Sequence, residues 1–171
     1  EGTDRTLLRG NADLELLAAQ IYPTTGAFGQ IETGANATLR IGRAGQGTPE
    51  QPFSVFGRLA LIAGKVEQGG VLRAPLGGVS LGQETGGTQS VTLLPGSITS
   101  VSAAGLVMPY GATVDGLSYL FGGEAVKLVG AAGDSLYGVS LNGKSIDVRQ
   151  DALIDLSGGG TLTGAGFVSG R

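Results

Sequence analysis

The carboxyl groups of Asp147, Asp151 and Asp155 are the side chains of this chain whose spacing could support acid–base chemistry. Asp147 and Asp155 have the same outward parity in two successive predicted strands, so the two can lie on adjacent faces. Hydrolysis of a glycosidic bond needs two carboxyl groups about 5–9.5 Å apart in a groove. Because Arg149 stands among these aspartates and no aromatic residue is near to stack on a sugar, we interpret them as solvated charges that discourage sheet aggregation.

Three aromatic residues, Tyr110, Tyr119 and Phe121, lie in a glycine-containing stretch and are the candidates for ligand binding. Aromatic side chains on a segment that leaves the body of a protein can stack on sugar rings or anchor a protein partner. The same rings can instead cover the core of an irregular turn of the chain, and both interpretations stay open.

Other catalytic and cofactor chemistry finds little support in the residues. The chain has no His and no Cys, which removes the commonest general base and any thiolate metal site. The stretch "SGGGTLTGAG" (157–166) lacks the Gly-Lys-Ser/Thr ending of a phosphate-binding loop and opens no predicted helix, so we predict a corner turn. We therefore expect no enzyme activity, no catalytic residues, no metal and no cofactor.

The composition is that of a glycine-punctuated β protein. Gly accounts for 33 of the 171 residues, against an average usage of about 7%. The glycines do not recur at every third residue, which excludes a collagen triple helix. The net charge is −3 and no cluster of Lys and Arg is present, so we predict no nucleic-acid partner.

Short stretches of alternating apolar and polar residues predict strands throughout the chain. The stretch "NADLELLAAQIY" (11–22) fits a helix or a strand, and we favour a strand with Leu14 and Leu16 on one face. The other predicted inward residues are Leu39/Ile41, Leu59/Leu61, Val79/Leu81, Val91/Leu93 with Ile98, Val126/Leu128, Val139/Leu141, Ile146/Val148 and Ile154/Leu156.

The spacing of these strands indicates the architecture. Strands of three to five residues with short turns fit coils of roughly 20 residues with three faces, which is the parallel β-helix arrangement. We predict a single segment over 1–171, with loop excursions near 43–56, where Pro49 and Pro52 lie, and near 103–124. A hairpin sandwich is the alternative, and its support is the turn signal "LNGK" (141–144).

The phrases "GRLALIAGKVEQGGVLRAPLGGVSLG", "SVTLLPGSITSVSAAGLVMPYGATVDG" and "IDVRQDALIDLSGGGTLTGAGFVSGR" resemble segments of filamentous-haemagglutinin-type large exoproteins of Gram-negative bacteria. These are the secreted partners of two-partner secretion systems. The resemblance covers roughly 57–171. It implies an all-β, right-handed parallel β-helix and export through an outer-membrane β-barrel transporter. The amino-terminal secretion domain of the family and a toxin-like carboxyl-terminal domain are not recognised here, so we expect an interior shaft segment.

The function that the resemblance implies is structural. We expect a secreted or cell-surface shaft that extends distal domains for adhesion, aggregation or contact between cells, with a surface glycan or protein as a possible partner. The alternatives are a carbohydrate-binding or carbohydrate-cleaving β-helix, and a repeating subunit of an extracellular fibre. Cut from its neighbours, a β-helical segment exposes an unpaired strand edge at each end, so we also expect end-to-end self-association.

Overall fold

The computed structural model describes residues 5–83, 85, 87–115, 118–125 and 137–167, and every regular element assigned in them is a β-strand. The prediction of an all-β protein is therefore confirmed. The strands form four sheets, of which three are entirely parallel, and we call these three sheets A, B and C. The predicted strand pair Val126/Leu128 lies outside the described residues.

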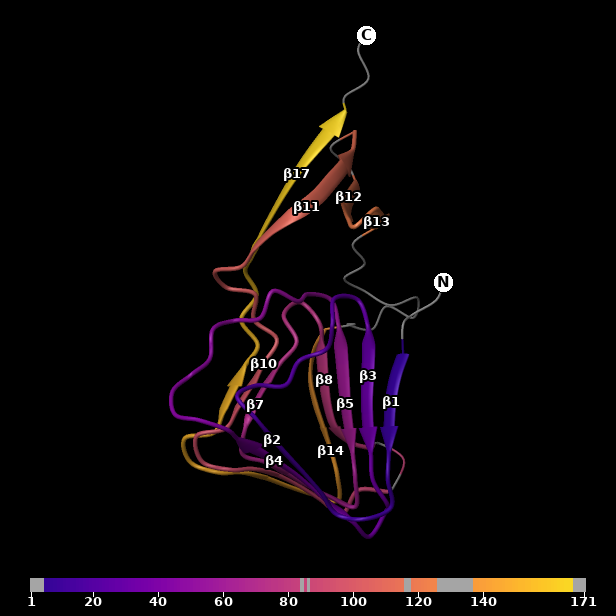
Figure 1. The fold of residues 1–171 in the computed structure, drawn as a ribbon, viewed down its shortest axis with the longest axis vertical. Coiled ribbons are helices and arrows are strands. Elements are labelled where there is room, and N and C mark those ends of the chain that lie inside the picture. The colour runs from indigo at the N-terminus through magenta and orange to yellow at the C-terminus, as the bar shows by residue number, and fades with distance from the viewer. Residues whose placement is uncertain (1–4, 84, 86, 116–117, 126–136, 168–171) are drawn as a thin grey trace.

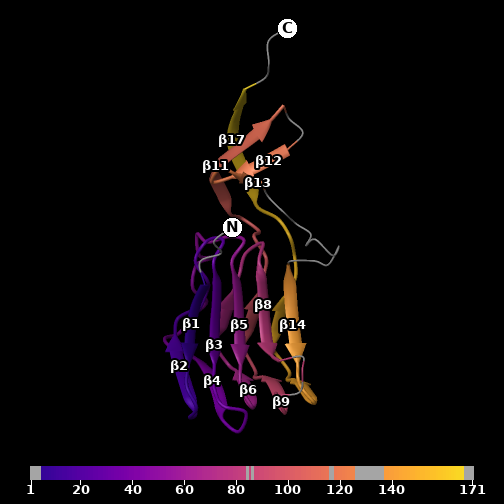
Figure 2. The same cartoon turned by 90° about the vertical axis from the view of Figure 1, so that its right-hand side faces the viewer.

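Sheet A contains five strands that lie side by side in the order β1-β3-β5-β8-β14 (Figure 2). Their bounds are Arg5–Arg9 for β1, Phe28–Glu32 for β3, Arg58–Ile62 for β5, Gly78–Gly82 for β8 and Gly138–Asn142 for β14. All neighbouring pairs are parallel and in register, without a bulge.

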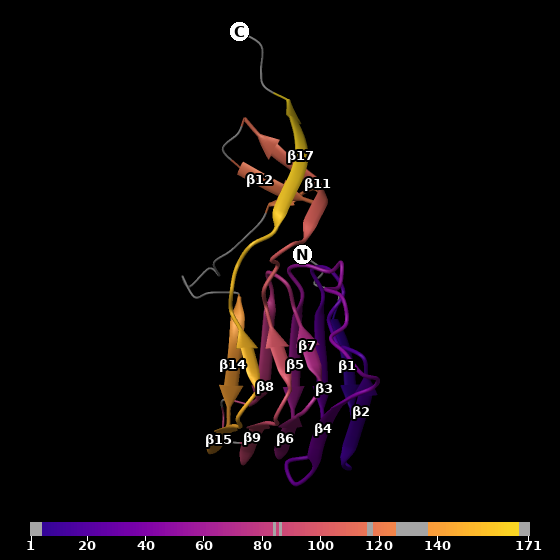
Figure 3. The same cartoon turned by 90° about the vertical axis from the view of Figure 1, so that its left-hand side faces the viewer.

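Sheet B also contains five strands, in the order β15-β9-β6-β4-β2 (Figure 3). Their bounds are Leu14–Ala18 for β2, Thr38–Arg43 for β4, Lys65–Gln68 for β6, Ser90–Leu93 for β9 and Ser145–Val148 for β15. The strand interpretation of 11–22 is thus confirmed, because Leu14 and Leu16 of β2 pack against the core while Glu15 is exposed.

Sheet C is smaller and consists of β7 (Val71–Arg73), β10 (Ile98–Ser100) and β16 (Leu153–Asp155) in the order β16-β10-β7. Ile21 extends this sheet by one further parallel bridge to Leu72. Residues 44–57, between β4 and β5, contribute no strand to sheet C. Ile21 therefore pairs directly with Leu72, which lies two passes through the sheets later in the chain.

The chain visits the sheets in the constant order A, B, C, and we call one such pass a circuit. Equivalent positions of successive circuits lie opposite each other, as Arg58 of β5 lies opposite Gly78 of β8. Where no large insertion intervenes, their separation along the chain runs from 20 residues, between Arg58 and Gly78, to 27 residues, between Val71 and Ile98. The coil length of roughly 20 residues expected from the sequence is therefore the shortest separation between paired residues of successive circuits.

The core lies between the three sheets and is built from columns of stacked side chains. One column of sheet A joins Leu61 to Leu81, and one of sheet B joins Val66 to Val91, and all four side chains are fully buried. Each column gains its burial from the circuits above and below, because neighbouring parallel strands are only about 4.8 Å apart.

The turns between sheets are tight, which explains part of the glycine content. Gly77 stacks on Gly57 where two successive circuits enter sheet A, and the N–H of Gly78 donates to the carbonyl of Gly57 at 3.1 Å. A Cβ on Gly77 would overlap the backbone of Gly57. A larger residue at this corner would therefore separate the circuits.

The fourth sheet, sheet D, projects from the body beyond the corner between sheets C and A (Figure 1). Its order is β13-β12-β11-β17, with β11 at Val107–Val114, β12 at Ser118–Phe121, β13 at Glu124–Ala125 and β17 at Thr161–Phe167. β11 pairs antiparallel with β12 and parallel with β17. The excursion expected near 103–124 covers β11, β12 and the start of β13.

Two inward assignments are wrong, and the hairpin that would support the alternative sandwich is absent. Ile98 is half-buried while Thr99 fills the inward position, because the register of β10 with β7 places Thr99 opposite Leu72. Leu156 follows β16 and is 61% exposed. Residues 141–144 form no hairpin, since β14 pairs with β8 and β15 with β9, in different sheets.

Candidate functional site

A second apolar cluster lies where the loop 44–57, sheet D and the body of the protein meet. Its buried members are Val55, Ala103, Leu106 and Met108. Partly buried side chains of Phe56, Leu76, Phe121 and Leu162 pack against it. This cluster is separate from the core between sheets A, B and C, and it attaches sheet D to the body.

Backbone hydrogen bonds hold the loop in this position. The N–H of Gly26 donates to the carbonyl of Val55 at 3.0 Å, and the N–H of Phe56 donates to the carbonyl of Pro75 at 3.0 Å. The side-chain amide of Gln51 also donates to the carbonyl of Ser102. The loop is itself one passage from sheet C to sheet A, and these bonds join it to the same passage one circuit earlier and to those one and two circuits later.

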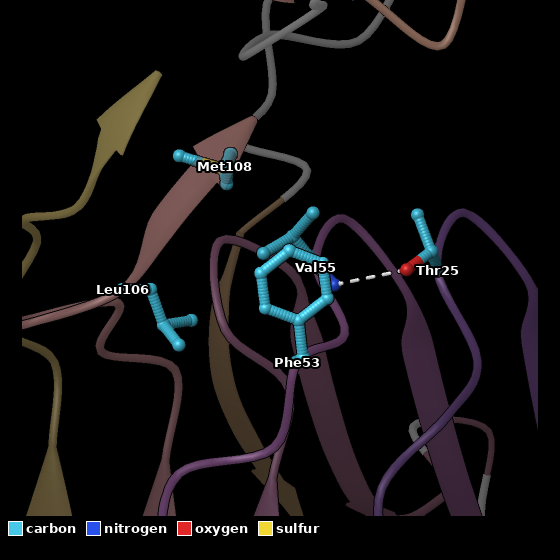
Figure 4. A pocket seen from close by; sticks show the side chains of 5 residues that line it. All are labelled: Thr25, Phe53, Val55, Leu106 and Met108. Carbon is cyan, nitrogen blue, oxygen red and sulfur yellow. Dashed lines mark hydrogen bonds between the residues drawn. The ribbon is translucent and has the colours of Figure 1, made fainter. Parts of the chain in front are cut away.

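A shallow apolar pocket opens at this junction (Figure 4). Phe53 and Val55 come from the loop, Leu106 and Met108 from the segment that leads into β11, and Thr25 accepts a hydrogen bond from the N–H of Val55 at 3.4 Å. The pocket volume is about 10 Å³, which is room for one water molecule. It can seat the tip of a side chain but cannot enclose a sugar or a cofactor.

The three aromatic candidates are distributed over this junction and sheet D. Phe121 contacts Phe56 edge to face with ring centroids 5.4 Å apart, so it belongs to the second cluster rather than to an open binding face. Tyr119 lies opposite Thr113 on sheet D, and 59% of it is exposed. Tyr110 belongs to β11, and its side chain lies outside the described residues.

The backbone at Phe56 is specialised for this packing. Phe56 has a φ of 62°, a left-handed conformation that a bulky residue adopts only where its surroundings impose it. Its ring contacts Phe121 and lies 6.5 Å from the ring of Tyr137. Burial at the same junction raises the pKa of the Tyr137 hydroxyl above its ordinary value.

The aspartates expected to be solvated charges take part in local polar contacts. Asp147 accepts a hydrogen bond from the guanidinium of Arg149 at 2.8 Å. Asp155 accepts hydrogen bonds from the hydroxyl of Ser157 at 2.6 Å and from its N–H at 3.0 Å. Asp151 lies in a turn with a φ of 62°.

The hydrogen bonds at Asp155 also determine its charge. The Ser157 hydroxyl and N–H hold the pKa of Asp155 below its ordinary value, and the hydroxyl of Ser100 adds to this effect. A general acid of a glycosidase needs a raised pKa. Asp155 is therefore tuned to remain a carboxylate. Among the residues that the structure describes, no group of three or more acidic side chains could hold a metal ion.

The corner-turn prediction holds only for residues 157–160, which lead from sheet C, whereas residues 161–166 belong to strand β17, so the prediction is wrong for the second part of the stretch. Gly159 and Gly160 have φ values of 106° and 91° and lie against Ala104 and Ala103. Their missing side chains allow β17 to approach the segment before β11.

Sequence reasoning missed an aromatic and basic group on the outer face of sheet A. The guanidinium carbons of Arg5 and Arg58 lie 5.5 and 5.4 Å from the ring centroid of Phe28. The three residues are opposite one another in β1, β3 and β5. Their separation along the chain carries no periodic signal, because the loop 44–57 intervenes between two of them, and only the strand register identifies them as neighbours.

Large apolar side chains are exposed at both ends of the stacked circuits. We call the edge strands β14, β15 and β16 the late face, and the edge strands β1 and β2 with Ile21 the early face. Ile146 and Val148 of the late face are each 49% exposed, although they continue columns in which Val91 and Leu93 are fully buried. Leu8 of the early face is 51% exposed in the column of Ile31 and Leu61.

Comparison of the chain with protein-family models, with curated proteins and with solved structures finds no match. In the part of the chain that the structure describes, no helix has the length and hydropathy needed to cross a bilayer.

Proposed function

We propose that the chain is a segment of a right-handed parallel β-helix that acts as a structural shaft. The observation that carries this proposal is the in-register stacking of successive circuits, in which equivalent residues of sheets A, B and C lie directly opposite one another. Parallel strands joined through crossover connections are right-handed in nearly all known cases. A stack of this kind is stiff along its axis and can be lengthened by adding circuits.

The parent of such a shaft is a secreted or cell-surface filamentous exoprotein of a Gram-negative bacterium, used for adhesion, aggregation or contact between cells. The resemblance of 57–171 to filamentous-haemagglutinin-type exoproteins supports this proposal. The absence of cysteine also supports it, because a chain without disulfides can pass unfolded through an outer-membrane transporter. Each circuit can then fold on the preceding one as the chain leaves the transporter. A surface glycan or protein is the partner of the whole fibre.

The role is non-enzymatic. Asp147 forms an ion pair with Arg149, and hydrogen bonds hold the pKa of Asp155 below its ordinary value, which does not suit the general acid of a glycosidase. A carbohydrate-binding module is the second candidate function, and it is favoured by the exposed ring of Tyr119 on the projecting sheet D. Loss of glycan binding by the variant Tyr119→Ala, with Tyr22→Ala as the control at a tyrosine that is also exposed, would identify that function.

Deletion of one circuit tests the β-helix. Removal of residues 58–77 joins Gly57 to Gly78, two residues that lie at the same corner of successive circuits, so β8 can stack on β3 and β9 on β4. We expect this variant to fold, with a β-rich circular dichroism spectrum and cooperative unfolding. Removal of the equally long segment 68–87 joins positions that are not equivalent and should prevent folding. If both deletions behave alike, the proposed architecture is wrong.

Surface exposure tests the biological role. Antibodies raised against the chain should label intact cells that produce it, and external protease should remove the label while a cytoplasmic marker protein survives. An in-frame deletion of the chain from its parent should reduce cell aggregation at unchanged export of the parent. Labelling that requires permeabilised cells would contradict the proposal.

A further inference from the structure

Arg5, Phe28 and Arg58 form one row across the outer face of sheet A, and we call these three residues the arginine clamp. Arg5 lies opposite Phe28 in the register of β1 with β3, and Phe28 lies opposite Arg58 in the register of β3 with β5. The guanidinium carbons lie 5.5 and 5.4 Å from the ring centroid of Phe28. Cation–π attraction therefore holds two positive charges in place beside one ring.

A polar network also fixes the guanidinium of Arg5. Its Nη2 donates to the side-chain oxygen of Gln30 at 2.7 Å, and the amide nitrogen of Gln30 donates to Glu32 at 3.0 Å. Gln30 is only 9% exposed although it lies on the outer face, so its amide is held by its surroundings. The charge of Glu32 is already paired with Arg9 at 2.9 Å. The network thus orients Arg5 without neutralising it.

The two arginines of the clamp have no carboxylate partner. Among the residues that the structure describes, neither Arg5 nor Arg58 forms an ion pair, and the guanidinium of Arg58 donates no hydrogen bond. Other exposed arginines are paired, as Arg40 is with Glu67 at 2.7 Å. The clamp therefore contributes two uncompensated positive charges to a chain whose net charge is −3. A local charge of this kind attracts anions.

The spacing of the two charges favours a ligand with repeated negative charges. Arg5 and Arg58 belong to β1 and β5, which lie on the two sides of β3 (Figure 2), so their strands are about 10 Å apart. A single carboxylate can reach one guanidinium only, because the ring of Phe28 lies between them. A linear polyanion that binds both must cross β1, β3 and β5, and it then runs along the direction in which the circuits stack.

The outer face of sheet A continues beyond Arg58 as a flat strip of small residues. The row of the clamp continues with Gly78 of β8 and Gly138 of β14, and the next row contains Ser80 and Ser140. No side chain among these four is larger than a hydroxymethyl group, so a linear molecule has room to lie there. The two hydroxyls can bond to the hydroxyls of a sugar.

The outer face stays accessible when further circuits adjoin this chain. An added circuit would pair with the free backbone edge of β1, which lies in the plane of the sheet. Arg58 illustrates the point, because β5 has a neighbouring strand on each side and Arg58 is nevertheless exposed. The clamp is therefore a property of the lateral surface of the stack.

We propose that the arginine clamp binds a linear acidic polysaccharide through its carboxylates, with the polymer lying along the direction of circuit stacking. The planar edge of a guanidinium offers two parallel N–H donors that match the two oxygens of a carboxylate. The sugars between two bound carboxylates pass over Phe28. This inference makes the shaft itself a binding surface, and it rests on the proposed function only for the location of the chain at a cell surface.

Titration of the purified chain with oligogalacturonate, in which every sugar carries a carboxylate, tests the proposal by calorimetry. We expect binding that weakens with rising salt concentration. Monomeric galacturonate should bind more weakly by about tenfold or more, since it reaches one guanidinium only. Neutral dextran of the same length should not bind. An oligogalacturonate that fails to bind, or that binds no better than dextran, would overturn the proposal.

Charge substitutions identify the site. Arg58→Gln and Arg5→Gln should each weaken binding about tenfold. The control Arg40→Gln removes the same charge from sheet B, where Arg40 is already paired with Glu67, and should bind like wild type. Arg58→Lys keeps the charge but loses the two-pronged edge, so it should weaken binding about fivefold. Unchanged binding by Arg58→Lys, or equal losses in Arg58→Gln and Arg40→Gln, would show attraction by charge alone and refute the clamp.

The deletion of 58–77 distinguishes this inference from the proposed function. It removes Arg58 and places Gly78 opposite Phe28, so the folded variant should bind as weakly as Arg58→Gln. Addition of Gly78→Arg to the deletion variant rebuilds the clamp and should restore binding. A folded double variant without binding would overturn the clamp and leave the β-helix intact. A deletion variant that does not fold, beside a binding defect of Arg58→Gln in the full chain, would support the clamp and contradict the β-helix.

Discussion

The buried side chain of Gln68 shows how one polar residue can join several circuits. It occupies an inward position between Ile41 and Leu93 and is fully buried. Its amide nitrogen donates to the carbonyls of Gly70 at 3.2 Å and Ile98 at 3.0 Å, and its oxygen accepts from the N–H of Gly70 at 3.0 Å. Gln68 thus ties the turn between sheets B and C to the next circuit.

Replacement of Gln68 by Ala should cost about 3 kcal/mol in the free energy of unfolding, because it leaves buried backbone groups of the turn without partners. Urea denaturation measures this cost. The control Gln89→Ala changes an exposed glutamine that bonds to the neighbouring circuits through its backbone N–H and carbonyl, and it should change stability by less than about 0.5 kcal/mol. Equal effects of the two substitutions would contradict the role assigned to Gln68.

Asp155 predicts a dependence of stability on pH. Its pKa is lowered in the folded protein by hydrogen bonds from Ser157, so the native state favours the carboxylate more than the unfolded chain does. This stabilisation is present above the unfolded pKa of about 3.9 and is lost as the pH falls through the lower folded pKa. We expect Asp155→Asn to be less stable than wild type near about pH 7, with a smaller difference near about pH 2.5. A difference that stays constant with pH would show that the charge of Asp155 contributes nothing.

At the scale of the element, a strand is stabilised by its place in the stack more than by its own sequence. Leu81 of β8 and Leu141 of β14 occupy the same column and pair with each other. Leu81 is fully buried because circuits lie on both sides of it, whereas Leu141 belongs to the edge strand and is only partly buried. The same residue type therefore has two environments in one column.

These two leucines allow a matched prediction. Leu81→Ala should destabilise the protein by about 3 kcal/mol, through lost burial and the cavity that remains, and Leu141→Ala by about half as much. Thermal or urea unfolding of the two variants measures the ratio. A cost at Leu141 as large as that at Leu81 would mean that β14 is covered in solution.

At the scale of the whole molecule, the body and sheet D differ in how they are stabilised. The body has a core enclosed by three sheets. Among the described residues, sheet D packs on the small second cluster at its base, and Val107, Val114 and Tyr119 on it are each more than half exposed. Local opening should therefore cost less free energy in sheet D than in the body.

Hydrogen exchange should resolve these two parts. We expect the amides of β5 and β8 to exchange slowest, since both strands are central in sheet A, and the amides of β12 and β17 to exchange much faster. Mass spectrometry of exchanged peptides can follow each strand. Equal protection of β12 and β8 would indicate that sheet D is covered by something other than the second cluster.

The sequence by itself predicted strands β2, β4, β5, β8, β9, β10 and β14 to β16 and most of their inward residues, but not β1, β3, β6, β7 or the strands of sheet D. Alternation of apolar and polar residues identifies Leu39 and Ile41, Leu59 and Leu61, and Val79 and Leu81, because a strand has a side-chain period of two and one of its faces is buried here. The same local rule misassigned Ile98, since the parity of a three-residue strand is decided by the strand beside it.

Only the tertiary structure decided which residues far apart in the chain become neighbours. Three features depend on how strands from distant parts of the chain pair. They are the position of Phe28 between Arg5 and Arg58, the packing of Phe121 on Phe56, and the exposure of Ile146 next to buried Val91. Insertions such as 44–57 change the number of residues between equivalent positions without changing the register. The periodicity of the sequence therefore does not predict which strands pair. The hydrogen bonds between circuits determine that pairing.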